Sequence, residues 1–374
     1  MKVGLVLDDT LDTPDGVQQH VLIVGAWLTD QGHEVHYLVG ATTRTDIPNV
    51  HSLSKNLHMR FNGNRMSMPL PTSRRKLRAF LAAERFDVLH VQVPYSPFMA
   101  GRLILAAPAT TAIVGTFHIL PYSGSVVFAN RALAIWNRRS GRRFDKMLAV
   151  SAPAREFAHS AYGYDAEVVP NPINLAQFMN ATSDSQTTNI VFLGRLVERK
   201  GAQHLLHAVT YLRDHGLYTG DLQVYIGGKG ELRAELERYI QANGLSEMVR
   251  LYGFVDETHK ALFLAQADIA VYPSTAGESF GIVLLEAMAA GRGVVLAGNN
   301  PGYEAVMQPY PSQLFDPTDM VQFAEKLAWY LDRPVERDAA ATVQKAYVQH
   351  FDIGIVGARL LTIYTRALQS RRGV

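Results

Sequence analysis

Short apolar runs alternate with segments of helical period along this chain, and this alternation limits its possible folds more than any other feature. Lys2–Leu7 is an apolar run, and the segment after it repeats apolar residues at Val17, Val21 and Val24, the spacing of a helix. Further strands, separated by segments of helical period such as 74–84, are expected at 34–39, 87–91, 112–117 and 146–150. Strands that alternate with helices predict a parallel sheet covered by helices on both faces.

The second half of the chain repeats this plan. Strands are expected at 189–194, 222–226, 249–252, 268–272 and 293–297, and helices at 202–215 and 353–371. Because 374 residues exceed one typical domain, we predict two α/β domains, and the polar segment 180–188 is expected to link them. Ligands bind beyond the carboxyl ends of the strands in open parallel sheets, so the expected site is the cleft between the domains.

The composition is that of a soluble globular protein, with 48% hydrophobic and 19% charged residues. Every apolar run is shorter than the ~20 residues of a membrane span, and two acids end the first run, which does not suit a secretory signal. The sequence contains no cysteine, so neither disulfides nor thiolate chemistry is expected and a cytoplasmic location is predicted. With a net charge of +2, any attraction to anionic partners must come from local clusters.

Two carboxylates, Glu278 and Glu286, lie around the expected start of an apolar helix in the second domain. Positions eight apart in a helix are separated by roughly 12 Å, so the pair could hold opposite ends of a nucleotide-sugar. The N–H groups of Ser279, Phe280 and Gly281 would form a helix N-terminus suited to a diphosphate. Capping of the helix by acidic residues is an equally good explanation of this spacing.

Other residues that could carry chemistry lie in loops after the expected strands. Arg195 and Lys200, in GRLVERKG, can converge on a departing diphosphate without a metal. Gly16 allows close approach of the backbone to a phosphate, and His118 could donate to a sugar hydroxyl or a phosphate oxygen. Alternatively, Arg195 and Lys200 are only solvated charges, Gly16 only allows a tight turn, and His118 is a structural histidine. The histidines show no ligand spacing and no D-x-D pair occurs, so no metal is predicted.

A basic amphipathic helix is expected in the first domain. Arg74, Arg75, Lys76 and Arg78 surround apolar positions in the manner of helices that lie on anionic lipid, worth about 1 kcal/mol per cation. A second basic group lies at 138–143. A solvated helix face is the alternative. Nucleic acid is not an expected partner, because the net charge is nearly neutral and an RNA-binding motif is absent from the sequence.

Several motifs together resemble those of the family-4 retaining glycosyltransferases, which have the GT-B fold. Glu278 and Glu286 match the E-x7-E signature of that family. Motifs that resemble the bacterial phosphatidylinositol mannosyltransferases in order and spacing are D-x-P-x-GVQ-x-HV at 12–21, FDVLH at 86–90, TFH at 116–118, VPN at 169–171, LGR at 193–195 and ESFGIVL-x-EAMAAG at 278–291. The resemblance implies a Rossmann-like acceptor- and membrane-binding domain at 1–180 and a Rossmann-like nucleotide-sugar-binding domain at 181–352. It also implies that a terminal helix at 353–374 packs back on the first domain.

The same resemblance implies roles for individual residues. In donor binding, Arg195, Lys200 and Gly16 would contact the diphosphate, Glu278 with the Phe280 and Gly281 amides the sugar, Glu286 the ribose, and the Val255 backbone the base. Ser279 and Ile282 would also bind the donor. His118 would contact the sugar and help to place the acceptor, and the catalytic set would be His118, Arg195, Lys200 and Glu278. Asn62, Arg65, Arg74, Arg75, Lys76 and Arg78 would bind the membrane or the acceptor.

The implied reaction is the transfer of a hexose, with retention, to a lipid acceptor such as phosphatidylinositol. The expected donor is GDP-mannose, which supplies mannose. The reaction would take place at the inner face of the cell membrane, on an anionic phospholipid surface, without an essential metal or an obligate protein partner. A UDP-sugar-dependent transferase for diacylglycerol, a soluble acceptor or a polysaccharide is the alternative. Three features depart from the family pattern: Asp15, Asn171-Pro172 and the segment ILPYSGS after His118. They weaken the assignment of the acceptor but leave retention and the use of a nucleotide-sugar as expected.

Two other classes of protein fit twin α/β domains. A dinucleotide-dependent oxidoreductase would carry G-x-G-x-x-G, which this sequence lacks. A sugar-binding protein without catalytic activity is usually exported, and no signal peptide is evident here. Both are therefore less favoured than the glycosyltransferase.

Overall fold

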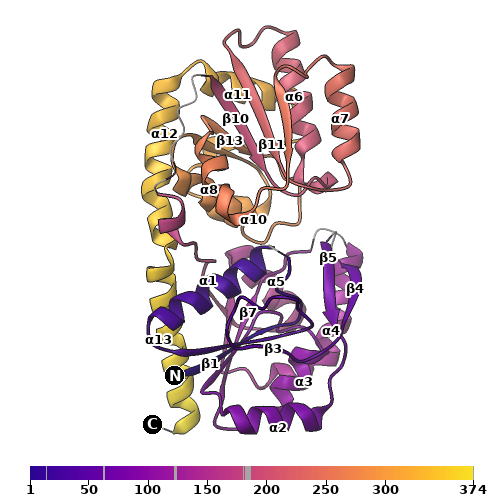
Figure 1. The fold of residues 1–374 in the computed structure, drawn as a ribbon, viewed down its shortest axis with the longest axis vertical. Coiled ribbons are helices and arrows are strands. Elements are labelled where there is room, and N and C mark those ends of the chain that lie inside the picture. Colours follow the sequence, from indigo (N-terminus) through magenta and orange to yellow (C-terminus); the bar gives the residue numbers. More distant parts are fainter. Residues whose placement is uncertain (14, 62–63, 122–123, 180, 182–186, 374) are drawn as a thin grey trace. The chain divides into compact units, whose positions relative to one another are not determined.

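The computed structural model describes residues 1–13, 15–61, 64–121, 124–179, 181 and 187–373, and the chain divides into two compact units (Figure 1). The first unit comprises Met1–Pro172 and Ile353–Val374, and the second comprises Ile173–Asp352. The division thus falls before the polar segment expected as a linker, and 180–188 lies mostly outside the described residues.

The first unit is built on a parallel sheet of seven strands in the order β3-β2-β1-β6-β7-β8-β9, counted over the described residues. The strands are β1 (Lys2–Leu7), β2 (Glu34–Val39), β3 (Val50–Ser52), β6 (Val88–Val91), β7 (Ala112–Phe117), β8 (Lys146–Ala149) and β9 (Ala166–Val168). The helices are α1 (Gly16–Asp30), α2 (Arg74–Glu84), α3 (Met99–Ala106), α4 (Gly124–Gly141), α5 (Ala152–Tyr162) and α13 (Ile353–Arg372). A separate antiparallel hairpin, β4 (Asn56–Phe61) with β5 (Asn64–Pro69), and the short β3 were not expected from the sequence.

The second unit has a parallel sheet of six strands in the order β12-β11-β10-β13-β14-β15 within the described residues. The strands are β10 (Thr188–Leu193), β11 (Leu222–Gly227), β12 (Val249–Gly253), β13 (Ile269–Tyr272), β14 (Val294–Gly298) and β15 (Leu314–Phe315). The helices are α6 (Ala202–Asp214), α7 (Arg233–Ala242), α8 (Glu257–Ala265), α9 (Ile282–Ala290), α10 (Pro301–Met307), α11 (Met320–Leu331) and α12 (Pro334–Tyr347). Short 3-10 turns are η1 (Leu175–Gln177), η2 (Glu198–Lys200), η3 (Pro311–Gln313) and η4 (Val348–Phe351). The expected parallel α/β plan is confirmed in both units.

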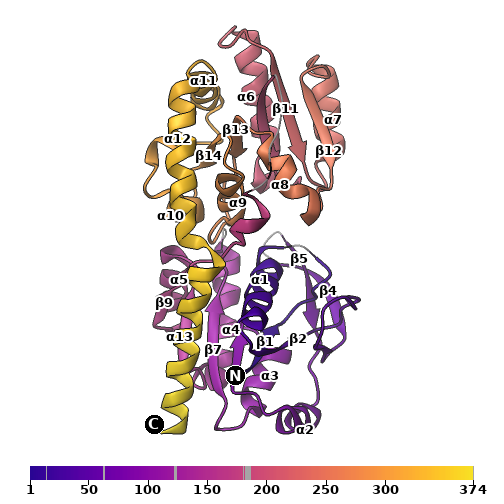
Figure 2. The same cartoon turned by 60° about the vertical axis from the view of Figure 1, so that its left-hand side comes forward.

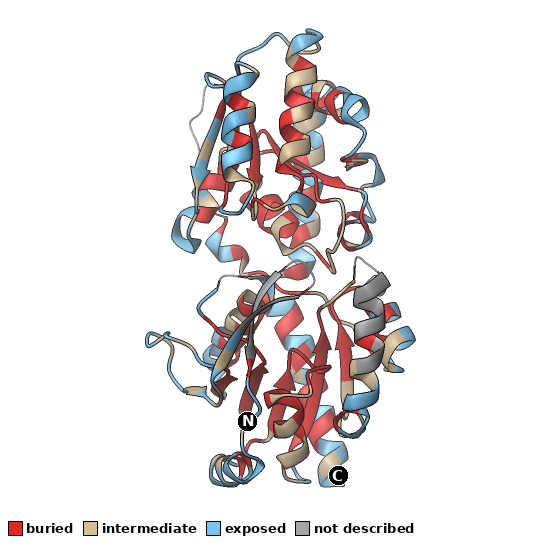
Figure 3. Ribbon diagram, turned by 90° about the vertical axis from the view of Figure 1, so that its right-hand side faces the viewer, coloured by how far each residue is buried: buried red, intermediate tan, exposed pale blue. Residues whose placement is uncertain are grey.

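The sheets form the cores of the two units. Figure 3 shows buried strands at the centre and helices whose outer faces are exposed. A parallel strand covered on both faces is buried on both, which explains why β1, β6 and β7 consist mostly of apolar residues. Most of the polar candidate site residues lie in the loops at the strand ends, whereas His90 in β6 and Thr116 in β7 are buried in the core.

The terminal helix α13 belongs to the first unit, where it packs against α1 and β7 (Figure 2). The Tyr364 hydroxyl lies 2.6 Å from Nδ1 of His90 in the core. Near its end, Arg371 pairs with Asp145 at 2.6 Å. A chain segment distant in sequence thus completes the first unit through both a buried hydrogen bond and an ion pair.

Candidate active site

The pairing of β10 with β13 brings two polar loops of the second unit together. Because the strands are parallel, the loops that follow them leave the same edge of the sheet. One loop passes through η2 to Lys200, and the other carries Glu278. Gly201 has a φ of +76°, and a Cβ at this position would lie 2.0 Å from the carbonyl oxygen of Pro273, so only glycine fits this close approach.

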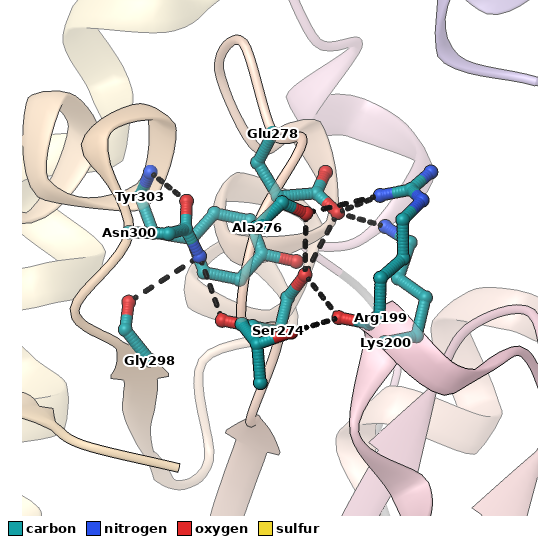
Figure 4. A network of polar contacts seen from close by, with 9 residues as sticks. Arg199, Lys200, Ser274, Ala276, Glu278, Gly298, Asn300 and Tyr303 are labelled. Atoms are coloured by element: carbon teal, nitrogen blue, oxygen red, sulfur yellow. Dashed lines mark hydrogen bonds and ion pairs between the residues drawn. The ribbon is translucent and has the colours of Figure 1, made fainter. Parts of the chain in front are cut away.

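Three donors of these loops converge on one carboxylate oxygen of Glu278 (Figure 4). Nη1 of Arg199 lies 2.6 Å, Nζ of Lys200 2.8 Å and Oγ of Ser274 2.9 Å from Oε1. The three charged side chains are only 12–17% exposed. All three of these contacts therefore end on the same carboxylate oxygen.

The charges of this cluster fix its protonation. Burial alone would raise the pKa of Glu278, but the neighbouring Lys200 and Arg199 lower it to about 2. Burial lowers the pKa of Lys200, while the attraction of Glu278 opposes this effect and Arg195 adds a further positive charge. Glu278 is therefore an anion at neutral pH and cannot act as a general acid. Two cations on one carboxylate leave a net positive charge, which favours an anionic ligand such as a diphosphate.

Hydrogen bonds of the Asn300 side chain and close packing at Gly302 hold the Glu278 loop. Nδ2 of Asn300 donates to the carbonyl oxygen of Ser274 at 2.9 Å, and its Oδ1 accepts from the N–H of Tyr303 at 3.1 Å (Figure 4). Asn300 thereby caps α10 and ties that helix to the loop. A Cβ on Gly302 would lie 2.0 Å from the Glu278 carbonyl oxygen, so the helix start packs directly against the loop.

The helix after this loop begins later than expected. Helix α9 starts at Ile282, and Gly281, with a φ of +124°, is its N-cap residue. The expectation that the N–H groups of 279–281 lie in the helix N-terminus is therefore wrong, because these residues precede it. Glu278 lies in the loop, so the helical rise does not set its separation from Glu286.

Glu286 lies inside α9 and has an ionic partner on α8. Its Oε1 lies 2.9 Å from Nζ of Lys260, and both residues are 6% exposed. Burial raises the pKa of Glu286, although the Lys260 charge opposes this shift. Lys260 also contacts the exposed Glu257 at 2.7 Å. The ribose contact of Glu286 remains a prediction, and its pairing with Lys260 was not expected from the sequence.

Two other expected donor residues of the second unit, Val255 and Phe280, lie in loops. Val255 is half-buried between β12 and α8. The Phe280 ring is buried against Phe351, with ring centroids 6.0 Å apart, and so packs in the core. Arg199 was missed because a charged residue in GRLVERKG gives no sign of its partner. Its place beside Lys200 was the available signal.

His118 and Gly16 lie in the first unit. His118 follows β7, and its Nε2 lies 2.8 Å from Oε1 of Gln92, which follows the neighbouring strand β6. Burial, together with the His20 and His90 rings, lowers the pKa of His118 well below its ordinary value, so the imidazole is neutral. Nε2 of Gln92 has no partner among the described residues. Gly16 is the exposed first residue of α1.

The expected basic helix is α2. Arg74, Arg75, Lys76 and Arg78 are exposed, whereas Leu77 and Leu81 are buried against the first unit. Asn62 lies outside the described residues, and Arg65 lies on β5 with a side chain that is not described. Among the helices of the described ranges, none combines the length and the apolar character needed to cross a bilayer.

Helix α4 exposes an apolar pair that the sequence analysis did not single out. Ile135 is 79% and Trp136 71% exposed. Arg138 and Arg139, one turn further on, are exposed as well. Exposed large apolar side chains beside cations are typical of surfaces that contact a membrane.

Two family models cover most of the chain. The model described as Glycosyltransferase Family 4 matches residues 14–177, and the model described as Glycosyl transferases group 1 matches residues 176–348. The phosphatidyl-myo-inositol mannosyltransferase of Mycolicibacterium smegmatis is 31% identical over 371 residues, which cover 97% of this chain and 93% of the relative. A protein of the same name from Propionibacterium freudenreichii is 31% identical over 389 residues, with 99% and 96% covered.

Solved structures share the fold. A glycosyltransferase from Rickettsia africae superimposes with a TM-score of 0.75 at 17% identity, covering 98% of both chains. The Anabaena HepE protein in complex with UDP-glucose gives a TM-score of 0.76 at 18% identity, covering 98% of this chain and all of the other. The fold and the family expected from the sequence are confirmed. The chain belongs to the family-4 glycosyltransferases and is a glycosyltransferase of the GT-B fold.

Proposed function

We propose that this glycosyltransferase transfers mannose from GDP-mannose, with retention, to a lipid acceptor such as phosphatidylinositol at the cytoplasmic membrane surface. The observation that carries the proposal is the cluster of Arg199 and Lys200 on Glu278, which suits the diphosphate and sugar of such a donor. The names of the relatives support the donor and acceptor. One relative, the GDP-mannose-dependent alpha-(1-6)-phosphatidylinositol dimannoside mannosyltransferase of Mycobacterium tuberculosis, is 28% identical over 302 residues.

In this reaction the bond from the sugar C1 to the leaving phosphate oxygen breaks. A bond from C1 to the acceptor hydroxyl oxygen forms on the same face, and the acceptor proton passes to the leaving phosphate. Lys200, Arg199 and Arg195 would stabilise the negative charge that develops on the diphosphate. The second oxygen of Glu278 would accept a hydrogen bond from a sugar hydroxyl, since this carboxylate stays ionised.

The remaining residues would position the two substrates. The neutral His118 would contact the donor sugar and the acceptor as a hydrogen-bonding group, since burial disfavours its cationic form. Gly16 would approach the diphosphate, the Val255 backbone the base, and Glu286 the ribose. Phe280 is buried in the core, so the sugar contact at that position would come from the backbone.

The exposed faces of α2 and α4 would bind the anionic membrane surface. The α2 cations supply electrostatic attraction, and Ile135 with Trp136 would insert among the lipid acyl chains. Both features lie in the first unit, which also carries His118. The enzyme would thus bind the membrane in which its lipid acceptor is embedded.

Reversing two charges on α2 is expected to weaken binding to anionic vesicles. At about 1 kcal/mol per cation, Arg74→Glu with Arg75→Glu should raise the apparent Kd at least 30-fold, and added salt should narrow the difference. Co-sedimentation with phosphatidylinositol-containing vesicles measures this change. The control is the double variant Arg238→Glu with Arg250→Glu, which reverses two exposed cations of the second unit. Equal losses in both variants would contradict a specific membrane face.

The donor and acceptor are tested together by incubating the protein with labelled GDP-mannose and phosphatidylinositol vesicles. A mannosylated lipid is expected. Transfer only from UDP-glucose, to diacylglycerol or a soluble acceptor, would establish the alternative function instead. A comparison of the thermal shifts caused by GDP and UDP separates the donor from the acceptor, because it needs no acceptor at all.

A further inference from the structure

A cluster of metal-ligating side chains lies at one edge of the first unit, apart from the residues assigned to glycosyl transfer. His36 comes from β2, His51 from β3 and Glu84 from the end of α2. One ligand atom of each residue lies within 4.8 Å of the other two. Nδ1 of His36 is 2.8 Å from Nε2 of His51 and 3.8 Å from Oε2 of Glu84.

A hydrogen bond to Glu34 fixes the orientation of the His36 ring. Its Nε2 lies 2.9 Å from Oε1 of Glu34, and a proton on Nε2 that is donated to this carboxylate leaves a lone pair on Nδ1. The rings of His36 and His51 are parallel to within 2°, so Nδ1 and Nε2 meet across a short gap. Two facing lone pairs repel, so a proton or a metal ion must lie between the rings. A histidine that binds a metal usually donates its other ring N–H to a carboxylate or a similar acceptor.

The charge of the surroundings favours a cation. Glu34 and Glu84 contribute two negative charges, and Lys2 contributes one positive charge, with its Nζ 2.9 Å and 2.7 Å from their respective oxygens. With neutral histidines the cluster is therefore anionic overall. Lys2 contacts Oε2 of Glu84 and would compete for it, which lowers the affinity for a metal without removing the two nitrogen ligands.

We propose that His36, His51 and Glu84 form a zinc site. Two imidazole nitrogens and one carboxylate oxygen suit Zn²⁺, whereas Mg²⁺ and Ca²⁺ prefer oxygen ligands alone. The ion would connect β2, β3 and the carboxyl end of α2, whose other residues carry the exposed basic face. Its effect is structural: it fixes the edge strand β3 and the basic helix α2 on the sheet.

Titration of the chelator-treated full-length protein with Zn²⁺ and Co²⁺ tests the site. We expect binding of one equivalent, a rise in Tm, and visible absorption bands of Co²⁺ that indicate nitrogen and oxygen ligands. His51→Gln and Glu84→Gln should each abolish these bands. Glu34→Gln should weaken binding about 10–100-fold, because it removes the support of a ligand. Lys2→Met should tighten binding, since it removes the competing ammonium.

The matched control is His159→Gln, which removes an exposed histidine of the same unit and should leave metal binding unchanged. Circular dichroism of the metal-free variants establishes that His51→Gln and Glu84→Gln are folded. If either variant is unfolded, the Co²⁺ titrations of Lys2→Met and Glu34→Gln test the site instead, through the tighter and the weaker binding expected for them. Binding of Co²⁺ that persists in folded His51→Gln and Glu84→Gln, or no binding at one equivalent by the unaltered protein, would overturn the proposal.

Discussion

Replacing Lys200 with alanine is expected to lower the rate of glycosyl transfer by about 10²–10³-fold, the usual effect of losing one charged or hydrogen-bonding group that stabilises a leaving anion. The loss should appear mainly in kcat, because the negative charge on the diphosphate grows in the transition state. The fold should survive, since Glu278 keeps its contacts with Arg199 at 2.6 Å and Ser274 at 2.9 Å. Steady-state kinetics with the labelled donor measure the effect.

Two further variants separate charge from geometry at this position. Lys200→Arg keeps the charge but changes its shape, so it should recover part of the rate. Arg250→Ala removes an exposed cation of the same unit and should leave kcat unchanged. A Lys200→Ala enzyme with unchanged kcat and a raised KM would show that Lys200 binds the donor without acting on the leaving group.

The strands and their end loops could be predicted from the sequence because buried parallel strands are mostly apolar. The runs at 34–39 and 112–117 have the same bounds in the sequence and the structure. The partners of the site residues could not be predicted in this way. Lys200 was expected to contact a diphosphate and Arg199 was missed, and neither was expected beside Glu278, to which the pairing of β10 with β13 brings them. The helix start was misjudged because Ser279 and Phe280 are compatible with a first turn, whereas Gly281 adopts a positive φ.

The His36–His51 pair shows a second limit of sequence reasoning. The two histidines are 15 residues apart, which matches no metal-ligand motif, and β3 is only 3 residues long. So short a strand carries too few residues to show a period of two. The pairing of β2 with β3 in the folded sheet is what brings the two rings together. A cluster that depends on strand pairing becomes visible only in the structure.

Replacing Lys260 with methionine is expected to destabilise the protein by about 3 kcal/mol, because it leaves the carboxylate of Glu286 buried without its partner. Both side chains are nearly inaccessible, at 7% and 8% exposure. Urea unfolding followed by circular dichroism measures the loss. Glu257→Gln, which removes only the exposed partner of Lys260, should cost less than about 1 kcal/mol and serves as the control.

The pH dependence of the Lys260→Met variant follows from the same burial. Burial raises the pKa of Glu286, and Lys260 now opposes that shift, so without Lys260 the pKa should rise further. A carboxyl group with a raised pKa in the folded state favours folding fully below its unfolded pKa and loses that contribution as the pH rises. The loss of unfolding free energy in the variant, relative to the wild type, should therefore be smaller in mildly acidic buffer than at neutral pH. A loss that grows on acidification would contradict this account.

The double variant Lys260→Met with Glu286→Leu separates the structural role of Glu286 from its expected contact with the ribose. Apolar residues of similar volume often replace a buried ion pair without loss of stability, so the double variant should be more stable than Lys260→Met alone. If Glu286 binds the ribose, donor affinity should still fall in this stable protein, as measured by the thermal shift with GDP. Wild-type affinity in the double variant would leave Glu286 only its role as the partner of Lys260, and the donor would then be held by the Glu278 cluster without it.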